Sequence, residues 1–253
     1  MENGESYRLD IYKDVPESEK NKPTFLTLEG SNIDLPLGYI TNLKEDGDFR
    51  SKESLEVLSE CDIVVTNPPF SLFREFIDTL FEYNVNFLVI GSQNAVTYKE
   101  TFNYIQSGKM WLGANYGDMA FKVPSHYEPR ETRFWIDESG QKWRSMGNIC
   151  WFTNLDFKQR HDELILYKKY SPEEFPFYDD YEVINVNKVA DIPVDYDGIM
   201  GVPITFFNKF NPDQFEIVGL ANSARYLGDF ECYTLIDTKK IYNRVLIKRK
   251  DKK

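Results

Sequence analysis

The sequence predicts an α/β fold with a β-rich C-terminal region. Two short aliphatic runs, at residues 61–66 and 87–90, flank a segment with helical spacing of apolar residues, which is the pattern of a strand–helix–strand unit. After about residue 171, short apolar runs alternate with turn residues, which favours β-structure. The chain has 253 residues, of which 42% are hydrophobic, so it can form a packed core.

The strand predicted at residues 61–66 is continuously apolar, which is typical of a parallel strand buried on both faces. A Pro-Pro pair ends it, because proline cannot donate to a sheet ladder. Ser71 is then expected to cap a helix. The apolar face of that helix is expected to consist of Leu72, Phe73, Phe76, Ile77, Leu80 and Phe81. The strand at 87–90 would complete the unit.

Further elements are predicted downstream. A helix is expected at 99–106, ended by Gly108, followed by strands at 109–113, 148–154 and 164–167. Residues 114–146 lose regularity, which indicates a long loop or a small insertion. Strands are also expected at 204–207, 215–220 and 245–248.

The predicted organisation has two domains. Residues 1–170 would form the first, with 1–45 irregular, and residues 171–253 the second, with a basic C-terminal tail. The chain has a net charge of −11, yet residues 239–253 hold eight basic residues and one acidic residue. A basic end on an acidic body fits a local phosphate contact, and a solvated or frayed tail explains it equally well.

Composition excludes several classes of protein. The longest aliphatic runs are far shorter than the roughly 18 to 20 residues of a membrane span, so no membrane partner is expected. Three scattered cysteines, Cys61, Cys150 and Cys232, indicate buried thiols in a reducing cytoplasm. Two histidines, His126 and His161, are too few for a Cys/His zinc pattern, so no metal is expected.

The segment that carries chemistry comes directly after the first predicted strand, where ligands bind in open α/β sheets. We call it the NPPF segment, and it consists of Asn67, Pro68, Pro69 and Phe70. A strand-ending turn would also explain a Pro-Pro pair. The strand–helix context favours a functional loop.

These residue types suit methylation of an exocyclic amine. The lone pair of the adenine N6 amine is delocalised into the ring, so two acceptors on its hydrogens would favour a pyramidal, nucleophilic nitrogen. The side-chain carbonyl of Asn67 and the backbone carbonyl of Pro68 can supply those acceptors, and the prolines hold them in place. Phe70 offers a stacking face for a base rotated out of the duplex.

The sequence DIVVTNPPF, with GDFRS at 47–51 upstream, resembles the amino-methyltransferase signature. More narrowly, the chain resembles the EcoRI-like family of adenine-specific DNA methyltransferases. The segments FLVIGSQNAVTYKE at 87–100, KMWLG at 109–113 and GVPITFFNKFNPDQFEIVGL at 201–220 carry this resemblance, which covers about residues 45–225.

The resemblance implies a partial Rossmann-like methyltransferase sheet, S-adenosyl-L-methionine as cofactor, and sequence-specific N6-methylation of adenine in duplex DNA, of the kind found in restriction–modification. It maps the NPPF segment onto the catalytic loop with a flipped adenine. It places Asp48 and Phe49 at the adenine of the cofactor, although Asp48 is equally well explained as a turn residue. The C-terminal region would help to recognise the target.

Two features depart from the family pattern. No strand with a Gly-rich cofactor turn appears before residue 47, so the N-terminal portion of the family is expected to be absent or supplied by a separate polypeptide. The acidic balance requires a local basic face for DNA. Alternatives are therefore a non-catalytic DNA-binding or split-subunit remnant, or an enzyme that methylates glutamine or an RNA base.

Overall fold

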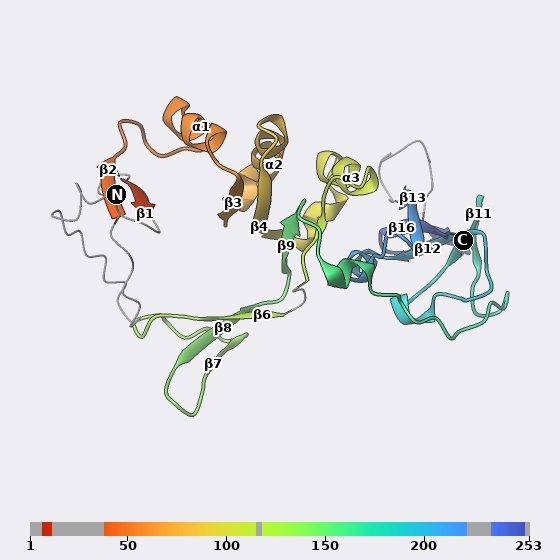
Figure 1. Ribbon diagram of the computed structural model, residues 1–253. Coiled ribbons are helices and arrows are strands. Elements are labelled where there is room, and N and C mark those ends of the chain that lie inside the picture. Colours follow the sequence, from red (N-terminus) through yellow and green to blue (C-terminus); the bar gives the residue numbers. More distant parts are fainter. Residues whose placement is uncertain (1–6, 12–37, 115–117, 222–233, 251–253) are drawn as a thin grey trace. The chain divides into compact units, whose positions relative to one another are not determined.

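The computed structural model describes residues 7–11, 38–114, 118–221 and 234–250 (Figure 1). The chain divides into two compact units, Met1–Cys61 and Asp62–Lys253. Several small sheets and a few helices make it a mixed α/β protein, which confirms the predicted class at this level. None of the helices in the described ranges is long and apolar enough to cross a membrane.

The first unit contains a strand pair and one helix. β1 (Tyr7–Ile11) pairs antiparallel with β2 (Gly38–Asn42), although residues 1–45 were expected to be irregular. α1 (Lys52–Ser59) begins after Ser51, whose side chain accepts a hydrogen bond from the backbone N–H of Ser54. This cap satisfies one of the backbone donors left free at a helix start.

A four-stranded mixed sheet forms the centre of the second unit. Its order is β3-β4-β9-β5, where β3 (Ile63–Thr66) runs parallel to β4 (Asn86–Ser92). β9 (Ile149–Thr153) is antiparallel to β4, and β5 (Trp111–Leu112) is antiparallel to β9. α2 (Phe73–Glu82) connects β3 to β4, which confirms the predicted strand–helix–strand unit.

The predicted apolar face of α2 is largely confirmed. Phe73, Phe76, Ile77 and Leu80 are buried, and burial of each such side chain stabilises the fold by about 1.5–3 kcal/mol. The expectation that Ser71 caps the helix is wrong. A 3₁₀ turn, η2 (Phe70–Leu72), precedes α2, and the N-cap is Leu72 with no side-chain hydrogen bond.

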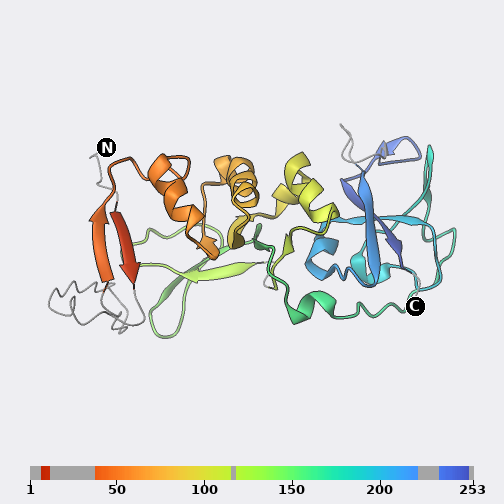
Figure 2. The same ribbon diagram turned by 45° about the horizontal axis from the view of Figure 1, so that its top comes forward.

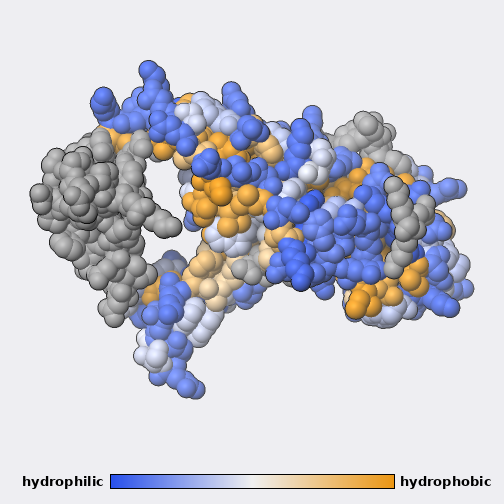
Figure 3. Space-filling view, viewed as in Figure 1, coloured by the Kyte–Doolittle hydropathy of each residue, from blue (hydrophilic) through white to orange (hydrophobic). Residues whose placement is uncertain are grey.

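β3 is not buried on both faces as predicted. In the part of the chain that the structure describes it is an edge strand, paired only with β4. Ile63 and Val65 on its outer face are 50% and 64% exposed. Hydrophobic surface is visible in this region in Figure 3. Apolar continuity indicated a strand correctly, but it does not distinguish an edge strand from a central one.

The segment between β4 and β9 holds a helix and a small sheet. The 3₁₀ turn η3 (Gln93–Thr97) leads into α3 (Lys99–Gln106), which confirms the helix predicted at 99–106. The loop or insertion expected at 114–146 contains an antiparallel sheet of order β6-β8-β7, formed by β6 (Met119–Lys122), β7 (Phe134–Ile136) and β8 (Lys142–Met146). The alternative of a small insertion therefore agrees with the structure, and the alternative of a long irregular loop is wrong.

The C-terminal region is built around a five-stranded sheet of order β10-β11-β12-β16-β13, seen from a second direction in Figure 2. Its strands are β10 (Phe177–Tyr178), β11 (Tyr181–Asn185), β12 (Ile199–Pro203), β13 (Phe215–Ala221) and β16 (Arg244–Arg249). A hairpin of β14 (Leu235–Ile236) and β15 (Lys239–Lys240) lies before β16 in the chain. β13 and β16 confirm the strands predicted at 215–220 and 245–248.

Three expectations for this part of the chain fail. Residues 204–207 belong to a 3₁₀ segment, η6 (Ile204–Lys209), in which Phe206 and Phe207 are buried. Residues 164–167 form no strand. Residues 244–249 are no frayed tail, because β16 lies between β12 and β13 in the sheet. Two more 3₁₀ segments within the described residues are η4 (Lys158–His161) and η5 (Val189–Asp191).

Candidate functional site

The NPPF segment follows the carboxyl end of β3. The parallel register pairs Thr66, the last residue of β3, with Val89 of β4. The NPPF segment therefore begins on the side of the sheet where the carboxyl ends of β3 and β4 lie. Open α/β sheets bind ligands in crevices beyond the carboxyl ends of their strands. The structure therefore places the four predicted residues at the position that the sequence indicated.

Both proposed acceptors are available. Asn67 is exposed at the surface. Neither its side chain nor the carbonyl of Pro68 has a hydrogen-bond partner among the described residues. The carbonyl of Pro69, in contrast, accepts from the backbone N–H of Leu72 at 2.9 Å. Two oxygens next to one another in the chain can thus accept hydrogen bonds from a ligand, while the third holds the turn.

The two prolines and Phe70 have different environments. Pro68 is buried, which anchors the segment, whereas Pro69 is exposed. The Phe70 ring is 41% exposed although it begins the turn into α2. An exposed aromatic ring beside two unpartnered acceptors can stack on a planar ligand.

Asp48 and Phe49 belong to the first unit. The Asp48 carboxylate accepts from Nε of Arg50 at 2.8 Å and from Nη2 at 2.6 Å. These hydrogen bonds, with one from the Arg50 backbone, lower the pKa of Asp48 to about 2. The Arg50 guanidinium also lies 5.5 Å from the centre of the Phe49 ring. Asp48 is therefore an ionised acceptor held by Arg50, a partner that the sequence analysis did not single out.

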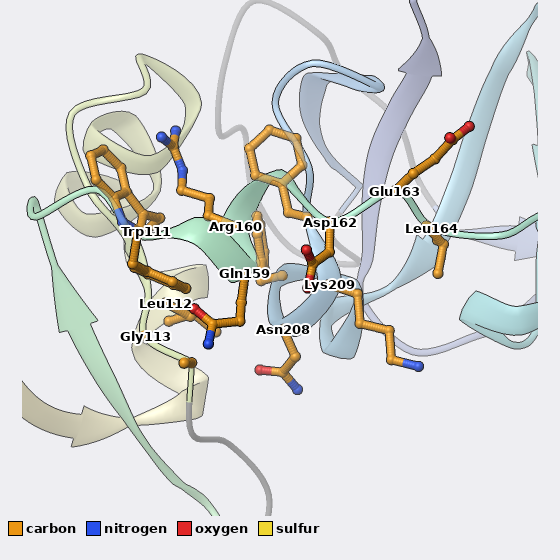
Figure 4. A pocket seen from close by; sticks show the side chains of 14 residues that line it. Trp111, Leu112, Gly113, Gln159, Arg160, Asp162, Glu163, Leu164, Asn208 and Lys209 are labelled. Carbon is orange, nitrogen blue, oxygen red and sulfur yellow. The ribbon is translucent and has the colours of Figure 1, made fainter.

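A separate pocket lies at the end of β5 (Figure 4). Its volume is about 310 Å³, and Trp111, Gly113, Arg160 and Asn208 are among the residues that line it. The Arg160 guanidinium lies 3.7 Å from the centre of the Trp111 ring and forms one wall. None of the NPPF residues lines this pocket, so the pocket is separate from the predicted catalytic segment.

His161 links two carboxylates. Its Nδ1 lies 2.7 Å from Asp213, and its Nε2 lies 3.0 Å from Asp156. Hydrogen bonds to Asp213 and then Asp156 raise the pKa of His161, because both carboxylates favour the charged ring. No pattern in the sequence indicates this link, since Asp213 is 52 residues away from His161 along the chain.

The cysteines that the structure describes show no catalytic environment. Cys150 is buried, as predicted, and burial raises the pKa of its thiol to about 12. Cys61 is half-buried, and Cys232 lies outside the described residues. Across the described ranges no group of three His, Cys, Asp or Glu side chains could hold a metal ion.

Comparison with known proteins identifies relatives along most of the chain. The family model for the adenine-specific methyltransferase EcoRI matches residues 3–252. The chain is 50% identical over 209 residues to the type II methyltransferase M.EcoRI of Escherichia coli, a match that covers 81% of this chain and 63% of the relative. It is 40% identical over 227 residues to M.MgeORF184P of Mycoplasma genitalium, covering 83% of this chain and 71% of the relative.

A third relative, the type II methyltransferase M.MpnI of Mycoplasma pneumoniae, is 37% identical over 243 residues, with 89% of this chain and 74% of the relative covered. No solved structure matches the chain. The chain thus spans less than two thirds of the length of its E. coli relative. The family match is continuous across both units, and the chain belongs to the family of the adenine-specific methyltransferase EcoRI.

Proposed function

We propose that this protein transfers a methyl group from S-adenosyl-L-methionine to the N6 amine of adenine in DNA, in a sequence-specific modification reaction. The observation that carries the proposal is the NPPF segment at the carboxyl end of β3, with the Asn67 side chain and the Pro68 carbonyl unpartnered among the described residues. The relatives of this chain are named as type II methyltransferases, which supports the same reaction.

In this mechanism the chain positions the amine and stabilises its reactive form. The Asn67 side-chain oxygen and the Pro68 carbonyl each accept one amine hydrogen, which localises the nitrogen lone pair. Phe70 stacks on the adenine after it leaves the duplex. The cofactor, when bound, supplies an electrophilic methyl group. Neither acceptor is a base, so the proton lost by the methylated nitrogen passes to water.

Asp48 and Phe49 would hold the adenine of the cofactor. Asp48 fits this role chemically, because a carboxylate with a pKa of about 2 stays ionised and keeps lone pairs beyond those that Arg50 uses. Phe49 adds an aromatic surface for a purine ring. A variant Asp48→Ala is expected to weaken S-adenosyl-L-methionine binding measured by calorimetry.

The finer architecture is also a proposal. The order β3-β4-β9-β5 supports a partial Rossmann-like sheet in which β3 is an edge strand among the described residues. We infer that a further strand from a separate polypeptide extends the sheet there, because the backbone groups on the outer edge of β3 have no described strand as partner. Residues 171–253 would then recognise the target sequence, with residues 1–170 holding the catalytic part. Genomic DNA as substrate implies action in the cytoplasm.

The test is transfer of labelled methyl groups from S-adenosyl-L-methionine to unmethylated duplex DNA, with the modified base identified. N6-methyladenine is expected, and Asn67→Ala should lower the rate by about 10²–10³-fold, as loss of one positioned polar group does. Asn86→Ala is the matched control, because this exposed asparagine lies at the opposite, amino end of β4. Equal loss in both variants would remove the special role of Asn67.

A second reading is a split subunit that needs a complementing polypeptide, for which the edge of β3 that is unpaired among the described residues would be a contact. It predicts no transfer by the folded chain alone and transfer after addition of the part of the E. coli relative that this chain does not cover. Methylated glutamine or methylated RNA as the product would contradict both readings. No transfer even with the added segment would indicate a protein that binds DNA without modifying it.

A further inference from the structure

Arg244, the first residue of β16, is a buried arginine whose neighbours carry no opposite charge. The residue is only 8% exposed, and no carboxylate in the described ranges forms an ion pair with it. Its Nε donates to the side-chain oxygen of Asn185 at 3.3 Å, and its Nη1 donates to the carbonyls of Tyr242 and Asn243 at 3.3 and 3.4 Å. Nη2 donates to none of the described groups. Burial lowers the pKa of Arg244, because a buried charge without a counter-ion costs free energy that a bound anion would offset.

Arg244 lines a pocket at one edge of the five-stranded sheet. β11 and β12 run parallel, and β16 is antiparallel to β12, with Arg244 opposite Pro203. The last residues of β11 and β12 therefore lie at the same edge as the first residue of β16. The pocket lies there and has a volume of about 850 Å³, which is within the usual range of ligand sites, and Asn187 and Tyr242 also line it.

The other polar groups of this pocket also favour a ligand that accepts hydrogen bonds. The side-chain nitrogen of Asn185 donates to the side-chain oxygen of Asn187 at 2.9 Å, so the part of the Asn187 amide that is unpartnered among the described residues is its donor group. Tyr242 is 87% exposed and adds a hydroxyl. Among the described residues no acidic side chain lines this pocket, whereas Asp162 and Glu163 line the pocket at the end of β5. The pocket at Arg244 therefore suits an anion.

The 3₁₀ segment η6 connects this pocket to the carboxyl edge of the central sheet. Ile204, its first residue, lines the pocket, and Asn208 near its other end accepts a hydrogen bond from Nε2 of Gln93 at 3.4 Å. Gln93 directly follows β4, whose carboxyl end lies on the side of the sheet where the NPPF segment begins. A 3₁₀ segment rises about 2 Å per residue, so Ile204 and Asn208 are about 8 Å apart along it, or about two base steps of B-DNA. DNA bound at the carboxyl edge can therefore extend to the pocket.

We propose that this pocket binds a backbone phosphate of the DNA that carries the target adenine, with Nη2 of Arg244 and the Asn187 amide donating to the phosphate oxygens. The inference rests on the proposed function for its substrate. Arginine, asparagine and tyrosine side chains are among those that contact phosphates in DNA complexes. Such contacts fix the position of a protein on the duplex and read no base, so this contact is expected to be independent of sequence.

The test is binding of a fluorescein-labelled random-sequence duplex by the full chain, measured by anisotropy over a series of salt concentrations. Arg244→Gln is expected to weaken binding about tenfold or more, as loss of a charged hydrogen bond does, and to reduce the slope of log affinity against log salt by about one. Arg244→Lys keeps the charge, so it should keep the slope and recover part of the affinity. Lys248→Gln is the matched control, because it removes one charge from an exposed lysine near the other end of the same strand, and it should bind as the wild type does.

Asn187→Asp tests the pocket without changing the buried arginine. Its carboxylate would compete with the phosphate for the guanidinium, so DNA binding should weaken about tenfold. Stability towards urea should stay the same or rise, because the buried charge gains a counter-ion. An arginine with a purely structural role would leave DNA affinity unchanged in this variant. Asn86→Asp is the control, because it adds the same charge at an exposed asparagine at the amino end of β4.

The possible outcomes separate this inference from the proposed function. Wild-type affinity in Asn187→Asp and in a folded Arg244→Gln overturns the inference, while methyl transfer by the wild type keeps the proposed function standing. If Arg244→Gln does not fold, Asn187→Asp decides. No DNA binding by the wild type overturns both. Inorganic phosphate that stabilises the wild type but not Arg244→Lys at constant ionic strength, with DNA affinity unchanged in every variant, would assign the pocket to a small phosphate ligand and overturn the DNA assignment.

Discussion

At the scale of single residues, the NPPF segment separates structural from chemical roles. Pro68 is buried and the Pro69 carbonyl holds the turn into α2, so these two shape the loop. The Asn67 side chain and the Pro68 carbonyl keep their hydrogen-bonding capacity for a ligand. In the proposed mechanism, acceptors that are preorganised in this way need no rearrangement when the substrate arrives, so they would stabilise the reacting amine without a reorganisation cost.

Phe70 tests the stacking part of the mechanism. Phe70→Ala is expected to lower methyl transfer to DNA about tenfold or more while cofactor affinity stays within twofold, because base–aromatic stacking contributes about 1–3 kcal/mol. Phe70→Tyr should keep most of the activity. Kinetics at varied DNA concentration and calorimetry with the cofactor measure the two effects. Equal losses of both would contradict a stacking role.

His161 gives the fold a predictable pH dependence. Its pKa is raised above the usual 6.5 by Asp213 and Asp156, so its contribution to stability is fully present below pH 6.5 and is lost as pH rises through the raised value. The difference in urea unfolding free energy between wild type and His161→Gln should therefore shrink as pH rises. His126→Gln is the control at an exposed histidine. A difference that does not change with pH would contradict the link.

At the scale of elements, sequence reasoning succeeded where one face is strongly patterned. α2 and α3 follow from helical spacing of apolar residues, and β4 follows from a continuous apolar run. It failed where apolar runs are ambiguous. The run at 204–207 buries Phe206 and Phe207 from a 3₁₀ segment, which satisfies the same apolar pattern as a strand.

Other elements were missed although weak signals existed. YRLDI in β1 alternates apolar and polar residues, and KWRSM in β8 alternates bases with other side chains, both at the period of a strand. The position of the NPPF segment between a strand and a helix could be predicted because its residues are adjacent in the chain. The pairing of Asp48 with Arg50 and of His161 with Asp213 depends on backbone and tertiary geometry that composition does not encode.

The contact between α2 and the central sheet depends on Gly91. A Cβ at this position would lie 2.5 Å from the Phe73 ring and 2.9 Å from the Phe152 ring. Gly91→Ala is therefore expected to destabilise the protein by about 1–3 kcal/mol through overpacking, measured by urea unfolding.

The double variant Gly91→Ala with Phe73→Leu provides the check on this cause. Leucine lacks the ring atoms that the new methyl group would meet, so the double variant should lose less stability than the sum of the two single changes. Additive losses would show that steric conflict with Phe73 is not the reason.

At the scale of the whole molecule, the C-terminal residues complete a sheet. β16 lies between β12 and β13, and Val245, Leu246 and Ile247 are fully buried. Arg244, Lys248 and Arg249 belong to this strand, so the basic composition of residues 239–253 alone does not reveal that the stretch contains a buried strand.

A chain that ends at residue 243 tests this role. It is expected to lose the cooperative unfolding of the C-terminal sheet, because β12 and β13 would no longer be joined. Circular dichroism and urea unfolding measure the change. A chain that ends at residue 250 is the control and should unfold as the full chain does. A cooperative transition in the shorter chain would show that β16 is dispensable.

The outer edge of β3 also has a consequence for handling the protein. In the part of the chain that the structure describes, no strand pairs with this edge, and Ile63 and Val65 beside it are exposed. Such an edge is a template for pairing between molecules, and short apolar strands without charge promote aggregation. Concentrated preparations of the chain are therefore expected to self-associate through β3. Val65→Lys should oppose this pairing through charge repulsion and keep the chain monomeric.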